Sequence, residues 1–125
     1  MNPIEFPKIY IGTDIVEVRR INKLTAKLGR KFLDRIFTTS EQNYCDEKAA
    51  PSIHYSGRFA AKESIVKALK SSGYDMPLVF KNIEILPSES GAPLVSLKFD
   101  ISGECKVSIS HTDNYATAMA IFILI

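Results

Sequence analysis

The order of the hydrophobic patterns along the chain is the feature that most restricts its fold. A short run from Lys8 to Thr13 is rich in β-forming residues, and the spacing then changes to the three-and-four pattern of amphipathic helices. Helical spacing continues to about residue 72, and strand-like segments fill the rest of the chain. One strand, then helices, then a block of strands predicts an α+β fold with a largely antiparallel sheet.

Regular alternation of strands and helices is absent from the sequence, and so are the phosphate-binding motifs GxGxxG and GxxxxGK[ST]. The sequence therefore excludes the Rossmann and P-loop architectures. The chain has 125 residues, close to the roughly 150 residues expected of one domain. Internal repeats and low-complexity linkers are also absent, so we expect a single domain spanning residues 1–125.

Local signals predict where the helices begin and end. Hydrophobic residues recur every three or four positions from Val18 to Leu28, and Gly29 is a stop signal for this first helix. The capping-box spacing of Thr38 and Glu41 predicts a second helix that runs towards residue 47. A long helix begins near Pro51, because proline is acceptable at a first helical position, and ends before residue 73.

The strands expected in the second half follow turn signals and alternating hydrophobic residues. Within the strand at residues 106–111, Val107 and Ile109 alternate with serines. The expected strands are residues 78–86, 93–99, 106–111 and 115–125, with turns at residues 88–91 and 112–114.

Charge is unevenly distributed along the chain. Sixteen Lys and Arg residues against fourteen Asp and Glu give a formal net charge of +2, which by itself implies no particular partner. From Glu17 to Arg35, however, seven basic and two acidic residues give +5, and the rest of the chain carries −3. The basic face of a helix at residues 17–35 is usually solvated; otherwise it could bind a nucleic acid or an acidic protein surface. Its one aromatic residue, Phe32, fits the hydrophobic stripe rather than a base-stacking surface.

Cysteine usage and hydropathy indicate the compartment. Cys45 and Cys105 lie far apart without the spacing of a zinc site or a disulfide framework, which favours free thiols in a reducing compartment. The first residues lack a basic start followed by a hydrophobic run, so no signal peptide is expected. The longest hydrophobic stretch, residues 118–125, is well short of the ~20 residues that cross a bilayer. We expect a cytoplasmic protein without membrane contact.

The long helix contains the densest candidate chemistry. At about 100° per residue, Glu63 and Lys67 lie one turn apart on one face. That face also contains Ser56 and lies away from the predicted core stripe of Tyr55, Phe59, Val66 and Leu69. A surface ion pair is the ordinary interpretation. The functional interpretation makes Glu63 an oxygen ligand for Mg²⁺ and Lys67 a charge for a phosphate.

Two further residues are candidates. Asp14 is the natural second carboxylate, since Mg²⁺ takes one or two protein carboxylates, although an Asp between a strand and a helix commonly caps the helix. His111 follows a predicted strand, where histidine is usually structural or exposed. Ser110, His111 and Asp113 do not predict a catalytic triad, because neighbours in sequence rarely point the right way and a GxSxG motif is absent.

Four segments together resemble the holo-(acyl carrier protein) synthase family, the small bacterial 4′-phosphopantetheinyl transferases. Their order and spacing match the family over nearly the whole chain, and the Arg-Phe-Ala-Ala-Lys-Glu run with Ser-Ile-Ser-His is specific to the superfamily. The matching segments are residues 11–16 (IGTDIV) with Arg20-Ile21, residues 37–41 (FTTSE) with Tyr44-Cys45, residues 57–64 (GRFAAKES) with Lys67-Ala68, and residues 107–112 (VSISHT) with Tyr115-Ala116.

The resemblance implies transfer of the 4′-phosphopantetheine arm from coenzyme A to a serine of apo acyl carrier protein, with release of adenosine 3′,5′-bisphosphate. It implies that Asp14 and Glu63 hold Mg²⁺ and act in catalysis together with Lys67. The residues that would contact coenzyme A phosphates are Arg58, Lys62, Lys67 and His111. The general base stays open between Glu63, a metal-bound water and a group on the carrier protein.

The resemblance also implies partners. In the family the first helix docks the acidic carrier protein, and members form homotrimers with an active site at each subunit interface. The docking residues carried over to this chain are Arg20, Lys27, Lys31 and Arg35. The chain departs from the family pattern at residues 70–73 (KSSG), where a Gly-Thr-Gly stretch is usual, and at residues 91–93 (GAP). A non-catalytic nucleic-acid-binding module that uses the basic helix is the alternative function.

Overall fold

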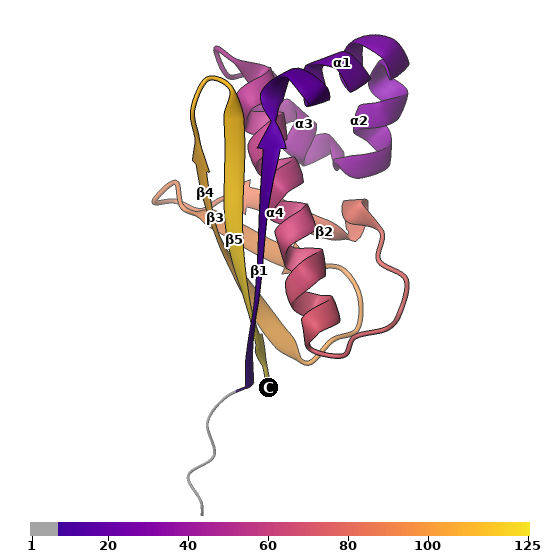
Figure 1. Ribbon diagram of the computed structural model, residues 1–125, viewed down its shortest axis with the longest axis vertical. Coiled ribbons are helices and arrows are strands. Elements are labelled where there is room, and N and C mark those ends of the chain that lie inside the picture. The colour runs from indigo at the N-terminus through magenta and orange to yellow at the C-terminus, as the bar shows by residue number, and fades with distance from the viewer. Residues whose placement is uncertain (1–7) are drawn as a thin grey trace, which may run out of the picture.

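The computed structural model describes residues 8–125, and its strands and helices follow one another in the order expected from the sequence (Figure 1). Most of the N-terminal segment in which no signal peptide was expected lies outside the described residues. The elements are β1 (Lys8–Glu17), α1 (Val18–Leu28), α2 (Arg30–Ile36), α3 (Thr39–Asp46), α4 (Pro51–Ser71), the 3-10 helix η1 (Phe80–Asn82), β2 (Ile83–Pro87), β3 (Pro93–Leu97), β4 (Gly103–His111) and β5 (Tyr115–Leu124).

The strands form two antiparallel sheets. One sheet has the order β1-β5-β4, so the last strand of the chain lies between the first and the fourth; β2 and β3 form a separate pair. This confirms the α+β fold and the antiparallel pairing, although the strands divide between two sheets instead of forming one.

Small residues allow α4 to lie directly against the inner face of the three-stranded sheet (Figure 1). The alanines at positions 116, 118 and 120 of β5 alternate inward and are buried. A methyl group on Gly12 of β1 would overlap the carbonyl oxygen of Ser64 and lie 2.8 Å from the amide nitrogen of Ala68. Gly12 thus brings β1 into backbone contact with the helix.

The helices before α4 confirm the local signals but not the single basic helix. The capping box forms: the amide of Glu41 donates to Thr38 Oγ1 at 3.2 Å, and the amide of Thr38 donates to Glu41 Oε1 at 2.9 Å. Gly29 has a φ of 66°, which a helix interior does not allow. The basic segment 17–35 is therefore two helices, α1 and α2, and the prediction of one helix was wrong.

Several strand boundaries differ from the prediction because pairing extends or shortens the strands; β3, for example, ends at residue 97 instead of 99. β1 continues through Asp14 to Glu17, since this stretch pairs with β5 and Asp14 lies opposite Ala118. Asp14 is therefore not a helix cap, and the N-cap position of α1 is Glu17. Residues 80–82 form η1 instead of the first part of a strand, and β4 begins at residue 103, three residues earlier than expected.

The burial of α4 is wider than the predicted stripe. Tyr55 and Leu69 are buried as expected, but Phe59 and Val66 are only partly buried. The polar residues Ser56, Arg58 and Lys62 are buried instead. The reason is that α4 packs against the three-stranded sheet on one side and against α1 and α3 elsewhere. Arg58 and Lys62 are buried because they donate hydrogen bonds to β2, α2, α3 and η1.

Among residues 8–125, no helix combines the length and hydrophobicity needed to span a membrane.

Candidate active site

The structure brings Asp14, Glu63 and Lys67 together at the β1 edge of the sheet. Lys67 Nζ donates to the carbonyl oxygen of Thr13 at 2.9 Å and to Asp14 Oδ1 at 3.2 Å. The salt bridge of Lys67 therefore joins α4 to β1. In the described part of the chain, Lys67 pairs with Asp14 and not with Glu63, the partner expected from their spacing along the helix.

Backbone pairing fixes the position of Asp14. Residues 10, 12, 14 and 16 of β1 share the face towards α4, because side chains alternate along a strand. The carbonyl of Asp14 accepts a hydrogen bond from Thr117 Oγ1 of β5 at 2.9 Å. Together with the contact at Gly12, this pairing holds the Asp14 carboxylate beside the face of α4 that carries Glu63 and Lys67.

The electrostatics of Glu63 show that the two carboxylates repel each other. Burial raises the pKa of Glu63 above its ordinary value, and the negative charge of Asp14 raises it further. Lys67, Arg20 and Lys70 act on the same pKa in the opposite direction. The two carboxylates thus lie close enough for the charge of one to act on the other, and a cation bound by both would relieve this repulsion.

These two carboxylates fit Mg²⁺. Carboxylate oxygens are the ligands that Mg²⁺ prefers, and it usually takes one or two of them and completes its shell with waters and substrate phosphates. Among residues 8–125 no cluster of three or more His, Cys, Asp or Glu residues could hold a metal. Two carboxylates, Asp14 on β1 and Glu63 on α4, are the number of protein ligands expected for an ion that also binds a phosphate of the substrate.

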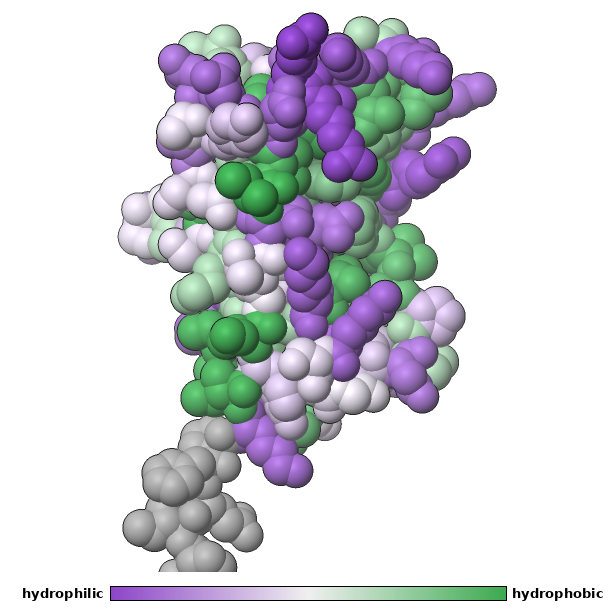
Figure 2. Space-filling view, in the orientation of Figure 1, coloured by the Kyte–Doolittle hydropathy of each residue, from purple (hydrophilic) through white to green (hydrophobic). Residues whose placement is uncertain are grey.

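The basic residues of α1 and α2 are exposed, and one of them, Arg20, lies near this pair. Arg20 lies close enough to Glu63 to lower its pKa. Figure 2 shows hydrophilic side chains over both helices. All four predicted docking residues, Arg20, Lys27, Lys31 and Arg35, are exposed. Next to Arg35, a groove of about 510 Å³ is lined mainly by the hydrophobic residues Phe32, Ile36, Phe59, Leu78 and Val79.

Arg58 and His111 lie away from the acidic pair. The guanidinium of Arg58 stacks over the ring of Tyr44 at 4.1 Å, and its Nε donates to the carbonyl oxygen of Ile85 at 3.2 Å. His111 ends β4, at the sheet edge opposite β1, and its ring lies 6.2 Å from that of His54. Three of the four residues predicted to contact coenzyme A are thus divided between two edges of one sheet, with Lys67 at the β1 edge and Arg58 and His111 near the β4 edge.

Lys62 lies in neither group. It is 0% exposed, and its Nζ donates to Ile36 O at 2.8 Å, Glu41 Oε1 at 2.7 Å and Phe80 O at 2.9 Å. An ammonium has three N–H donors, and protein oxygens accept from all three. Burial lowers the pKa of Lys62, and the Glu41 carboxylate opposes this effect. Lys62 therefore has no N–H left to donate to coenzyme A, the contact that the resemblance implied. Its hydrogen bonds instead connect α4 to α2, α3 and η1.

Sequence comparison decides the family. The model of the 4′-phosphopantetheinyl transferase superfamily matches residues 10–120. The chain belongs to this superfamily. It is therefore a transferase, and the resemblance read from the sequence is confirmed.

Relatives and solved structures agree with this family assignment. The chain is 42% identical over 117 residues to the holo-[acyl-carrier-protein] synthase of Protochlamydia amoebophila, and the match covers 90% of this chain and 95% of the relative. The ACPS-CoA complex of Chronobacterium ammoniagenes matches with a TM-score of 0.82 at 27% identity, covering 94% and 98% of the two chains. A holo-[acyl-carrier-protein] synthase of Helicobacter pylori in complex with coenzyme A matches with a TM-score of 0.77 at 35% identity, covering 90% and 98%.

The sequence did not predict the group of side chains that surrounds Arg58. His54 precedes Arg58 by four residues on α4, which places the two on one face. Tyr44 and Lys48 approach them from α3 and the loop behind it. The four-residue spacing was a signal available in the sequence, whereas the approach of Tyr44 and Lys48 depends on tertiary packing.

Proposed function

We propose that this transferase is a holo-(acyl carrier protein) synthase: it moves the 4′-phosphopantetheine group of coenzyme A to a serine of apo acyl carrier protein. The meeting of Asp14, Glu63 and Lys67 carries the proposal, because it joins a carboxylate pair to a phosphate-binding cation. The names of the relatives and the coenzyme A complexes of similar structures support it. We further propose that residues 1–125 form one domain.

In the proposed reaction the serine oxygen attacks the β-phosphorus of coenzyme A. A new P–O bond forms, and the bond to adenosine 3′,5′-bisphosphate breaks. Asp14 and Glu63 would hold Mg²⁺, which when bound supplies Lewis-acid polarisation of the phosphate. Lys67 contributes positive charge where the pyrophosphate oxygens collect negative charge, and positioning of this kind supplies most of the catalysis in phosphoryl transfer.

The carrier protein would dock on the basic face of α1 and α2. Arg20 lies nearest the acidic pair, so a carrier bound there would present its serine close to Glu63. The hydrophobic groove beside Arg35 could receive an apolar side chain of the carrier. The one aromatic residue of the basic segment, Phe32, is buried, so this segment provides no surface for base stacking and does not favour the nucleic-acid alternative.

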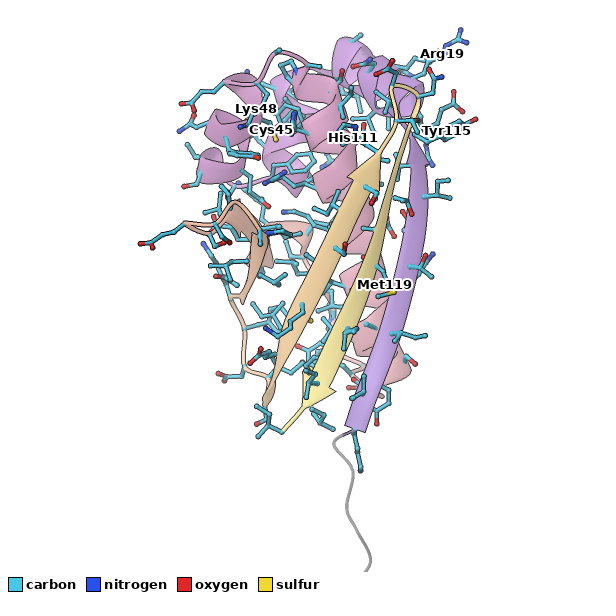
Figure 3. The ribbon with its side chains drawn as sticks, turned by 90° about the vertical axis from the view of Figure 1, so that its left-hand side faces the viewer. Arg19, Cys45, Lys48, His111, Tyr115 and Met119 are labelled. Atoms are coloured by element: carbon cyan, nitrogen blue, oxygen red, sulfur yellow. The ribbon has the colours of Figure 1, made fainter. Side chains whose placement is uncertain are left out.

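A homotrimer would complete the active site. Exposed hydrophobic residues lie on the face of the sheet opposite α4, namely Ile9, Ile11, Ile15, Tyr115 and Met119. Tyr115 and Met119 project from this face in Figure 3, and Figure 2 shows hydrophobic patches along β1. Contact between copies through this face would bring the β1 edge of one subunit next to the β4 edge of another. The acidic pair would then complement the Arg58 and His111 group of its neighbour.

The reaction is tested by mass spectrometry of an apo carrier protein incubated with coenzyme A and Mg²⁺. We expect the carrier to gain the mass of phosphopantetheine. We expect Glu63→Gln and Asp14→Asn to lower the rate by a factor of about 100 or more, since each removes charge at the reacting phosphate. Full activity of either variant would contradict the site.

Docking is tested separately with Arg20→Glu. Reversing this charge should weaken binding of the acidic carrier by about tenfold or more, because like charges across an interface repel. Coenzyme A binding should change little. A matched control is Lys98→Glu in the loop after β3, which lies outside both the basic helices and the three-stranded sheet. Loss of coenzyme A affinity in Arg20→Glu with unchanged carrier binding would refute the docking role.

A further inference from the structure

Three side chains that carry or can acquire positive charge lie against the ring of Tyr44, and a fourth, His111, lies against one of them, His54. Lys48 Nζ lies 4.5 Å and Arg58 Cζ lies 4.1 Å from the centroid of Tyr44. The ring of His54 lies 6.0 Å from that of Tyr44 and 6.2 Å from that of His111. Figure 3 shows Lys48 and His111 at the same end of the molecule. We call these five residues the Tyr44 cluster.

The Tyr44 cluster has no acidic partner in the described part of the chain. None of the salt bridges of residues 8–125 involves its members. The charged or titratable groups that act on His54 are Arg58 of the same helix, Lys48 behind α3 and His111 of β4, and no carboxylate is among them. Positive groups gathered around a half-buried histidine without a counter-ion indicate a site for an anion.

The charge of His54 depends on the groups around it. Burial lowers its pKa, and Arg58, Lys48 and His111 lower it further. Without an anion the imidazole is therefore neutral near pH 7. A dianion at the cluster would reverse the electrostatic effect of these neighbours and favour the protonated ring.

We propose that His54 is a further phosphate-binding residue, which takes up one proton from solvent and donates an N–H to a phosphate monoester held by Arg58 and His111. The proposal rests on the proposed function, in which Arg58 and His111 bind phosphates of coenzyme A. Coenzyme A carries a pyrophosphate and one phosphate monoester, at its ribose 3′ position. Because the pyrophosphate is assigned to the acidic pair, the 3′-phosphate is the group left for the Tyr44 cluster.

The sign of the pH dependence follows from the proton uptake. The pKa of His54 is lower without the ligand than with it, so affinity is highest at low pH and is lost as the pH rises through the ligand-bound pKa. The second pKa of a phosphate monoester is about 6. Measurements between about pH 6.5 and 8.5 therefore keep the ligand mainly dianionic while His54 titrates.

The test is calorimetric binding of coenzyme A and of 3′-dephospho-coenzyme A to the full chain, in buffers of different ionisation enthalpy. For coenzyme A we expect proton uptake by the wild type and less uptake by His54→Phe. At the low end of the pH range His54→Phe should bind coenzyme A about tenfold more weakly, the value of one charge-assisted hydrogen bond. The difference should shrink towards pH 8.5, and 3′-dephospho-coenzyme A should bind both proteins equally.

His54→Gln is the second variant, because glutamine donates a hydrogen bond but does not titrate. It should recover part of the affinity without the proton uptake. Equal proton uptake by wild type and both variants would overturn the proposal, as would an equal loss of affinity for 3′-dephospho-coenzyme A. Failure of the wild type to modify a carrier protein would refute the proposed function instead, and this is distinguishable because the binding test uses no carrier.

Discussion

Two lysines five residues apart on α4 show how tertiary contacts give one residue type different roles. Lys62 is enclosed and donates to Glu41 and two backbone carbonyls, whereas the exposed Lys67 donates to Asp14 and to one backbone carbonyl. The sequence predicted a phosphate contact for both. Only Lys67 is placed where it can exchange a protein partner for a ligand.

Substitution by methionine should separate these roles. Lys62→Met leaves the Glu41 carboxylate buried without its cation, so we expect the free energy of unfolding to fall by about 3–5 kcal/mol. Lys67→Met breaks an exposed pair and should cost about 1 kcal/mol or less, while lowering the rate of transfer strongly. Chemical denaturation and the carrier assay measure both. A stable Lys62→Met protein with weakened coenzyme A binding would contradict the structural role.

At the scale of elements, the contact between β1 and α4 determines the geometry of the site. Asp14 comes from the strand, and Glu63 and Lys67 come from the helix, so their separation depends on how closely the two elements approach. Gly12 permits this approach because any side chain there would meet the helix backbone. The glycine in the Ile-Gly-Thr-Asp motif is thus explained by packing rather than by a turn.

Gly12→Ala should therefore disturb both stability and activity. The added methyl group overlaps helix backbone, which cannot move aside cheaply, and overpacking of this kind costs about 1–3 kcal/mol. The comparison variant is Gly57→Ala, whose methyl group would lie 2.9 Å from one side-chain atom, the Cγ2 methyl of Ile109, and would meet no backbone. Alanine also gains up to about 1 kcal/mol of helix propensity, so we expect a smaller loss of stability than at Gly12. If Gly12→Ala were as stable as Gly57→Ala, the close approach would not be the constraint.

At the scale of the molecule, the central strand β5 separates two groups of candidate functional residues. The acidic pair lies at the β1 edge, and the Tyr44 cluster adjoins the β4 edge. Neighbouring strands lie about 4.8 Å apart, so the two groups are on different sides of one subunit. The proposed assembly through the exposed face of this sheet would account for both the separation and the exposed isoleucines.

Ile11→Asp should break this assembly. Ile11 is 64% exposed on the outer face of β1, and a charge there would be buried without a partner in a subunit interface. We expect a monomer by light scattering and loss of most transfer activity, with the thermal unfolding of the monomer still cooperative. Leu94→Asp is the control, since Leu94 is 60% exposed on β3 in the other sheet. A wild-type chain that is monomeric at working concentration would contradict the homotrimer.

Much of the fold could be predicted from local sequence signals. The capping box at Thr38, the stop at Gly29 and the proline start of α4 act through backbone groups within a few residues, so the sequence determined them. The four motifs likewise identified the family and named Asp14, Glu63 and Lys67. The length of β1 was not predicted, because its last residues are held by pairing with β5 about 100 positions later in the chain.

Only the tertiary structure decided which polar residues face each other. The sequence placed Glu63 and Lys67 one turn apart, but the partner of Lys67 is Asp14, which β1 brings from 53 positions away. It gave no reason to separate Lys62 from Lys67 or to place Lys48 beside His54 and Arg58. Helical and strand periodicities report which face of an element is hydrophobic, whereas the contacts of a polar side chain depend on the element packed against that face.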